Sequence, residues 1–174
     1  RVSIACGGHT GDAASMVAAL RRAAKFGVAV GAHPGYPDRA GFGRRALAAS
    51  GDDIAGWVTQ QTEMLAEQAA RLGLRLAHVK PHGALYNAAA GDPDVARAIA
   101  RAVAAFDSGL LLVGLAGSQL IAAGHAAGLA VLDIMDQEDL AGHALKVGAY
   151  LKARFVEIQQ KHRGLGDVRG QGLV

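Results

Sequence analysis

Four short apolar runs alternate with longer stretches of helical periodicity, and this alternation limits the possible folds more than any other feature. The runs are VSIAC at 2–6, VAVGA at 28–32, LRLAHV at 74–79 and LLLVGL at 110–115. Each run is continuously apolar, as in strands that are buried on both faces. Strands and helices in regular alternation are typical of a parallel sheet covered by helices. The sequence therefore predicts an α/β fold.

The stretches between these runs carry signals for helix starts and ends. Asp12 can cap a first helix, and Gly27 can end it. Ser50 and Asp53 have the spacing of a capping box ahead of a second helix. Asp92, followed by a proline at the first helical position, marks the start of a third. These signals predict helices between the strands.

Composition and charge exclude several classes of protein. The chain has 174 residues, of which 51% are hydrophobic and 19% charged, which suits one domain with a substantial core. Its net charge is +3 and 5% of its residues are aromatic, so we expect no nucleic-acid interface. The single cysteine, Cys6, excludes an internal disulfide, and no apolar run is long enough to span a bilayer. We therefore expect a cytoplasmic protein with no nucleic-acid or membrane partner.

Polar side chains gather in the turns that follow the apolar runs. They are His9 and Asp12 after the first run, His33, Tyr36, Asp38, Arg44 and Arg45 after the second, and Lys80, His82, Tyr86 and Asn87 after the third. Parallel strands point the same way, so these turns meet at one end of the sheet, where such folds hold their ligand sites. We therefore predict one composite pocket built from separate segments.

The residue types in this pocket suit attack on a carbonyl group. Histidine and aspartate transfer protons near neutral pH, and Lys80 can neutralise charge that builds on an oxygen. Histidine and aspartate can equally bind a metal ion. The sequence contains neither the phosphate-binding GxxxxGK[ST] motif nor the GxSxG nucleophile motif, so these two kinds of site are not expected.

Three residues in or near these turns also have a structural interpretation. His78 lies inside the third apolar run, and we expect a core or supporting histidine that is hydrogen-bonded to the backbone rather than a catalyst. Asp12 caps a helix whatever else it does. Cys6, at the end of a strand, is expected to serve packing, with a nucleophilic role as the alternative.

Four segments resemble, in order and spacing, the signature blocks of a known family. They are IACGGHTGD from position 4, GVAVGAHPGYPDRAGFGRR from position 27, HVKPHGALYN from position 78 and LLLVGLAGSQLIAAG from position 110. The resemblance is to the LamB/YcsF family, the A subunits of bacterial ATP-dependent 5-oxoprolinase, and it covers about residues 1–128. It implies a distorted, TIM-like (β/α) barrel of the glycoside hydrolase/deacetylase type.

The resemblance also implies an activity and a set of site residues. The activity is the opening of the cyclic amide of 5-oxo-L-proline to L-glutamate, coupled to ATP hydrolysis and performed with partner subunits B and C. The expected catalytic residues are His9, Asp12, His33, Asp38, Lys80 and His82, and the expected substrate-binding residues are Tyr36, Arg44, Tyr86 and Asn87. ATP is expected as a co-substrate that reaches the reaction through the partner subunits.

The family pattern is incomplete at both ends of the chain. Its first strand, which ends in an NCDLGE-like block, is absent, and so are its later EVFADR-like and HGD blocks. We therefore expect an incomplete barrel over residues 1–128. Residues 129–174 instead predict a long amphipathic helix from about Gln137, and GDVRGQGL resembles a segment of class III PLP-dependent aminotransferases. The PLP-binding residues of that family are missing, so no PLP is expected.

Three interpretations of function follow. The first is a 5-oxoprolinase component, in which His33 or His82 takes the proton of an attacking water and Lys80 stabilises the negative oxygen. The second is a metal-dependent amide or N-acetyl hydrolase that acts alone, with His9, Asp12 and His33 as ligands. The third is a non-catalytic remnant. Uncovered strand edges and helix faces also predict a chain that is marginally stable, homo-oligomeric or prone to aggregation.

Overall fold

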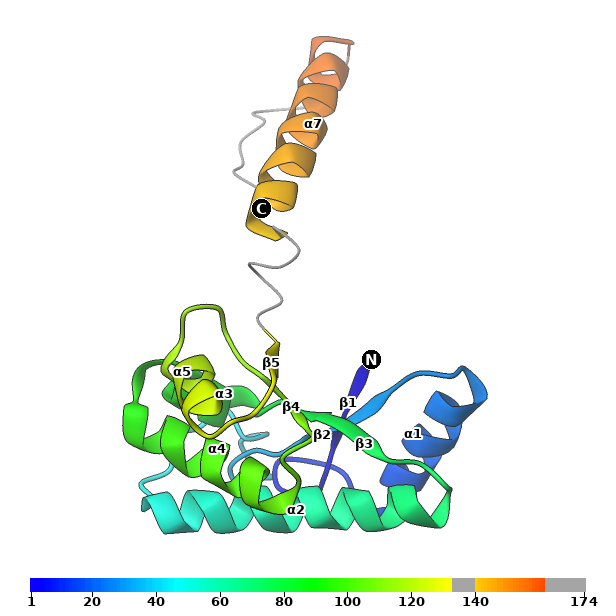
Figure 1. Cartoon of the computed structure of the whole chain (residues 1–174). Coiled ribbons are helices and arrows are strands. Elements are labelled where there is room, and N and C mark those ends of the chain that lie inside the picture. Colours follow the sequence, from blue (N-terminus) through cyan, green and yellow to red (C-terminus); the bar gives the residue numbers. More distant parts are fainter. Residues whose placement is uncertain (133–139, 162–174) are drawn as a thin grey trace. The chain divides into compact units, whose positions relative to one another are not determined.

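A computed structural model describes residues 1–132 and 140–161 of the chain (Figure 1). The chain divides into two compact units, Arg1–Asp133 and Ile134–Val174, and each is considered by itself. The first unit contains the sheet and all of the predicted site residues, and the described part of the second is one long helix. Within the described ranges, no helix is both long enough and apolar enough to cross a membrane.

The first unit is built on parallel strands that follow one another in sequence order across the sheet. They are β1 (Val2–Ala5), β2 (Val30–His33), β3 (Leu76–Val79), β4 (Leu111–Val113) and β5 (Val131–Leu132). Every neighbouring pair is parallel, which confirms the predicted α/β class. Neighbours that are consecutive in sequence are the arrangement of a (β/α) barrel, whereas a doubly wound sheet reverses its order. The predicted runs correspond to β1–β4, and β5 lies beyond them.

Helices lie between the strands, and the predicted caps are confirmed. The helices are α1 (Ala13–Lys25), α2 (Gly51–Arg71), α3 (Gly83–Gly91), α4 (Pro93–Phe106) and α5 (Gln119–Ala126). The Asp12 side chain accepts a hydrogen bond from the backbone N–H of Ser15 at the start of α1. Ser50 and Asp53 form the capping box of α2, and Asp92 caps α4. Helix α3 is not predicted by the sequence pattern, and the polar residues Tyr86 and Asn87 after β3 lie in it.

Alternate strand residues face opposite sides of the sheet, and one side is covered by helices. Ile4, Ala32, Val79 and Leu112 form a row across β1 to β4 and are no more than 5% exposed. They belong to one core with apolar residues of α1, α2, α3, α4 and α5, and Figure 1 shows α2 running beneath the strands. The polar ends of the strands are therefore held on a rigid, helix-backed sheet.

The second unit contains α7 (Leu140–Lys161), which confirms the long helix predicted for the tail. Its exposed apolar side chains are Leu145, Tyr150, Leu151, Phe155 and Ile158. The predicted helix start near Gln137 and the GDVRGQGL motif lie outside the described residues. The predicted division of the chain at residue 128 and its predicted self-association stay predictions.

Candidate functional site

Three histidines from three different segments meet at the carboxyl ends of the first three strands. His9 lies in the loop after β1, His33 is the last residue of β2, and His82 caps α3 in the turn after β3. The ring centroids of His9 and His82 lie 3.7 Å apart, with the rings stacked. The centroid of His33 lies 5.6 Å from that of His9 and 4.9 Å from that of His82. We call this group the histidine cluster.

Two backbone carbonyls fix the orientation of two of these rings. His33 Nδ1 lies 2.6 Å from the carbonyl oxygen of Lys80, and His82 Nε2 lies 2.9 Å from that of Phe42. A carbonyl oxygen only accepts hydrogen bonds, so both of these ring nitrogens carry a hydrogen. In the neutral rings the other nitrogens, His33 Nε2 and His82 Nδ1, are then unprotonated, and they lie 3.1 Å apart.

Burial keeps two members of the cluster neutral. His9 is 2% exposed, and its Nδ1 atom has no hydrogen-bond partner. This burial, reinforced by the neighbouring His82, His33 and Arg39, lowers the pKa of His9 to about 4. Burial also lowers the pKa of His33 from its ordinary value. Both imidazoles are therefore neutral at pH 7, the form that accepts a proton or binds a metal ion.

Arg39 and Gln61 hold the loops that carry the cluster, and the sequence analysis missed both roles. Arg39 Nη1 donates hydrogen bonds to the carbonyls of Gly7 and Gly11, at 2.8 and 2.9 Å, on either side of His9. The buried Gln61 of α2 donates from Nε2 to the carbonyl of Gly35 at 2.7 Å and accepts at Oε1 from the N–H of Gly35 at 3.0 Å. No local motif marks these contacts, because each joins distant segments.

The turn at Phe42 and Gly43 closes over the cluster. Phe42 has a φ of 54°, in the left-handed region that bulky residues rarely adopt. Its ring packs edge-on against His9 and His82, and its carbonyl accepts the hydrogen bond from His82. Gly43 has a φ of 64°, and a Cβ atom there would lie 2.7 Å from Cβ of His9. The cluster therefore requires a glycine at this position.

Lys80 lies beside the cluster, with its side chain directed toward α3. Its ammonium group lies 5.6 Å from the ring centroid of Tyr86, on the first turns of α3. Its positive charge contributes to lowering the pKa of His33. The half-buried Lys80 is thus a cation whose charge acts on His33.

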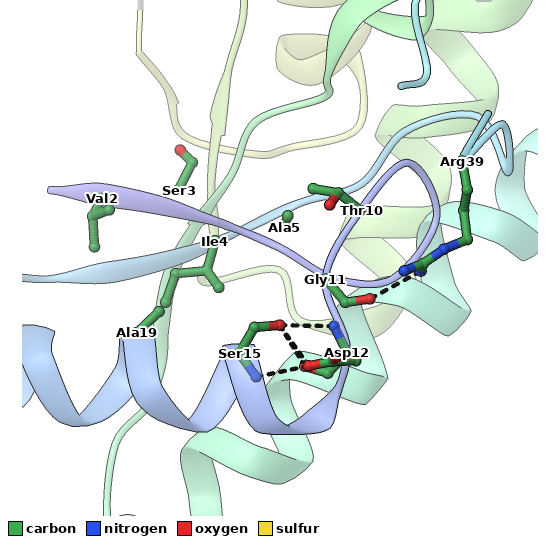
Figure 2. Close-up of a pocket in the computed structure, with 10 residues that line it drawn as sticks. All are labelled: Val2, Ser3, Ile4, Ala5, Thr10, Gly11, Asp12, Ser15, Ala19 and Arg39. Carbon is green, nitrogen blue, oxygen red and sulfur yellow. Dashed lines mark hydrogen bonds between the residues drawn. The ribbon is translucent and has the colours of Figure 1, made fainter. Parts of the chain in front are cut away.

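The two predicted carboxylates have structural partners outside the cluster. Asp12 is exposed, and its side chain accepts hydrogen bonds from the N–H and the hydroxyl of Ser15, both of which lower its pKa. Figure 2 shows Asp12 and Arg39 lining a pocket of about 510 Å³ beside β1, whose lining does not include the three histidines. The buried Asp38 is bound by the guanidinium of Arg45 and the N–H of Gly41, and the Arg45 hydrogen bond chiefly lowers the pKa of Asp38 to about 2.

The predicted substrate-binding residues occupy three different environments. Tyr36 is 3% exposed and packs edge-on against Trp57 in the core. Arg44 is exposed, with its guanidinium 5.7 Å from the ring centroid of Phe42. Tyr86 is half-buried beside Lys80, as described above, and Asn87 is exposed one residue further along α3. Of this group, Tyr86 lies next to a predicted catalytic residue, and Tyr36 lies in the core.

His78 and Cys6 are buried, as the sequence predicts, but the hydrogen-bond partner of His78 is a side chain rather than the expected backbone, and its Nδ1 atom has no partner among the described residues. The ring of His78 crosses Gly31 of the neighbouring strand, and its Nε2 atom lies 3.0 Å from the hydroxyl of Ser3. Burial lowers the pKa of His78 to about 4. Cys6 is fully buried, and this burial raises the pKa of its thiol to about 12. A thiol that stays protonated at neutral pH is not a nucleophile.

The histidine cluster is also a set of potential metal ligands. One ring nitrogen from each of His9, His33 and His82 lies within 4.8 Å of the other two. Asp12, which the sequence analysis placed in an alternative metal site with His9 and His33, does not belong to this set. Among the described residues, the group that can hold an ion here therefore consists of imidazoles alone.

Comparison with known proteins covers the part of the chain that contains this site. The model of the LamB/YcsF family matches residues 1–139. A protein of Chloroflexus aurantiacus, named as the A subunit of 5-oxoprolinase, is 58% identical over 130 residues, which are 75% of this chain and 51% of that protein. The protein of the same name from Methylococcus capsulatus is 57% identical over 129 residues, covering 74% and 50% of the two chains. This chain therefore spans about half the length of these curated relatives.

A solved structure supports the same relationship. The crystal structure of the lactam utilization protein from Thermus thermophilus matches with a TM-score of 0.74 and 48% sequence identity. The match covers 75% of this chain and 53% of the other. The family match also continues past residue 128, where the sequence analysis placed a change of family. The expected likeness of the tail to aminotransferases finds no support in these comparisons.

Proposed function

Because the chain belongs to the LamB/YcsF family, whose model matches residues 1–139, we propose that it is a component of a 5-oxoprolinase. The proposed reaction opens the cyclic amide of 5-oxo-L-proline to L-glutamate. The observation that carries this proposal is the histidine cluster, because it lies within residues 1–139, which the family model matches. The naming of these relatives as subunits favours an enzyme of several chains over a hydrolase that acts alone.

A five-membered lactam is a stable amide, so its hydrolysis needs activation. Transfer of the terminal phosphoryl group of ATP to the amide oxygen gives a phosphorylated imidate, whose carbon is open to attack by water. Attack of this water and cleavage of the C–N bond give an acyl phosphate, and its hydrolysis by a second water releases inorganic phosphate and leaves the open amino acid. The chain has no phosphate-binding motif of the Walker type, and we assign the nucleotide to partner subunits B and C.

Within this scheme the histidine cluster activates the attacking water. In the metal-free chain, His33 Nε2 and His82 Nδ1 are the unprotonated nitrogens that can accept its proton. The Lys80 ammonium stabilises the negative charge that forms on the substrate oxygen. Asp12 and Asp38 have structural roles in this proposal. The carboxylate of Asp12 is bound at the start of α1, and that of Asp38 is bound by Arg45.

The test is 5-oxoproline-dependent release of ADP by the full chain combined with subunits B and C. We expect His82→Ala and Lys80→Ala each to lower the rate by about 100-fold or more, the usual contribution of a proton-transferring or charge-stabilising group. Exposed residues of the same types, His125 and Lys25, provide matched controls as His125→Ala and Lys25→Ala. Rates that stay the same in both site variants would refute the site.

A further inference from the structure

We propose that His9, His33 and His82 form a binding site for one divalent transition-metal ion of the zinc class. In this site the chain supplies imidazole nitrogens only, and the remaining coordination positions are open to water or substrate. The inference goes beyond the proposed function and does not depend on it, because metal binding can be measured without substrate or partner subunits.

The first argument is the distance between two unprotonated nitrogens. His33 Nε2 and His82 Nδ1 lie 3.1 Å apart, and the backbone carbonyls of Lys80 and Phe42 hold the hydrogens of both rings on the opposite nitrogens. Two neutral lone pairs at this distance repel each other unless a proton or a metal ion lies between them. Two nitrogens bound to one zinc ion at ~2.0–2.1 Å and a tetrahedral angle are about 3.3 Å apart. The pair is therefore already spaced for an ion.

The second argument is the third imidazole. His9 is 2% exposed, its Nδ1 atom has no partner, and one of its ring nitrogens lies within 4.8 Å of the ligand atoms of the other two histidines. A shift of its ring by roughly 1.5 Å would bring all three nitrogens to distances that suit one ion. Buried polar atoms normally have partners, and an ion would give the buried Nδ1 of His9 a partner.

The third argument is the set of groups around the ligands. Histidines that bind metals almost always donate their other N–H to a carbonyl or carboxylate, which fixes the tautomer and the ring orientation. His33 and His82 both do this. The carbonyl that receives His82 belongs to Phe42, whose left-handed φ of 54° places it in a sparsely populated backbone region. The backbone is thus strained at Phe42, the residue whose carbonyl orients the candidate ligand His82.

The ligand type selects the class of metal. Imidazole nitrogens favour zinc, copper, nickel, cobalt and iron, whereas magnesium and calcium require oxygen ligands. The candidate set contains no carboxylate, and the charges of Arg39 and Lys80 act on His9 and His33. A site with this much positive charge favours an anion at an open position, such as hydroxide or a carboxylate.

Metal binding and proton acceptance use the same two nitrogens, so they exclude each other. When an ion is bound, His33 Nε2 and His82 Nδ1 no longer accept the proton of the water. Water activation then passes to the ion, which lowers the pKa of a bound water. The two states share the same two nitrogens, and metal content distinguishes them.

The experiment uses the full chain, purified without chelator for elemental analysis and then stripped and titrated with Co²⁺ and Zn²⁺. Four-coordinate Co²⁺ absorbs visible light, and Zn²⁺ competition gives the affinity. We expect one equivalent of metal and a loss of affinity of at least about 100-fold in His33→Ala and His82→Ala, since even residues that only orient ligands contribute 10–100-fold. His125→Ala, with an exposed histidine removed, is expected to bind like the original chain.

Two controls keep the outcome decisive. Circular dichroism shows whether each variant is folded, and His33→Gln keeps more of the side-chain volume if His33→Ala unfolds. Ring-nitrogen NMR of the unmodified chain needs no variant and is expected to show the His33 Nε2 and His82 Nδ1 signals shifting on addition of Zn²⁺. Absence of saturable Co²⁺ absorption, or equal affinity in all variants, would overturn the proposal. Loss of the 5-oxoprolinase reaction alone would not affect it.

Discussion

His33 Nε2 and His82 Nδ1 lie 3.1 Å apart, and each ring donates its other N–H to a backbone carbonyl. One residue ends β2 and the other caps α3, 49 positions later in the chain. The two imidazoles therefore depend on each other and on the carbonyls of Lys80 and Phe42. Changes that disturb these supports are expected to affect the cluster even where they touch no histidine.

Gln61 is expected to stabilise the fold through the loop at Gly35. Gln61→Leu keeps the side-chain size but leaves the buried N–H and carbonyl of Gly35 without partners. Each unsatisfied group costs about 1–3 kcal/mol, so for the two groups together we expect a loss of roughly 2–6 kcal/mol in the free energy of unfolding. Urea denaturation measures this loss. Gln60→Leu, on the exposed side of the same helix, is the control, and an equal effect of both variants would argue against the role.

The importance of Gln61 shows what the sequence cannot reveal. The order of strands and the meeting of three histidines at their ends follow from apolar runs and from parallel topology. The contact of Gln61 with Gly35 joins α2 to a loop 26 residues earlier, and the Phe42 carbonyl belongs to a turn whose direction depends on packing. Neither contact leaves a periodic or local signal in the sequence.

Two further differences have physical causes. Helix α3 escapes prediction because its cap, His82, makes no side-chain capping hydrogen bond and gives none of the usual start signals. Tyr36 shares a turn with the predicted site residues, but the edge-on contact with Trp57 of α2 holds it in the core. Residues in one turn point in different directions. Grouping residues by turn therefore predicts the histidine cluster correctly, but it also assigns Tyr36 to the site, although the ring of Tyr36 lies in the core.

Gly83 is expected to tolerate no side chain. Its φ is 54°, and a Cβ atom would lie 2.5 Å from the carbonyl oxygen of Gly43. We expect Gly83→Ala to lower the free energy of unfolding by at least about 2 kcal/mol, from the left-handed backbone and the clash together. Gly56 lies inside α2 with open space around it. Gly56→Ala is expected to raise stability by about 0.5–1 kcal/mol, and thermal unfolding of the pair tests the contrast.

His78 is expected to make the fold less stable in mild acid. Its folded pKa of about 4 lies below the ordinary value of 6.5, so the unfolded chain binds more protons between these pH values. Stability is therefore full above about pH 6.5 and falls as the pH drops toward 4. Urea midpoints in the presence of chelator should fall less steeply over this range in His78→Gln than in the original chain. Identical slopes would show that His78 does not carry the effect.

Asp12 is expected to matter as a helix cap. Asp12→Ala removes the acceptor for the N–H of Ser15 and should lower the melting temperature, whereas Asp12→Ser keeps a capping oxygen and should lower it less. Both variants should keep the 5-oxoproline-dependent activity when folded. Thermal unfolding and the ADP-release assay measure the two effects. If Asp12→Ser is fully stable but inactive, Asp12 is a catalytic residue after all.

The central claim is that His33 and His82 present two unprotonated nitrogens to each other. A long-range ¹H–¹⁵N correlation spectrum of the full chain, with labelled histidine, chelator and neutral pH, reads the hydrogen position on each ring. The expected result is a hydrogen on Nδ1 of His33 and on Nε2 of His82, as their carbonyl partners require. A hydrogen on Nε2 of His33 or on Nδ1 of His82, whether or not the other nitrogen of that ring also carries one, would contradict it.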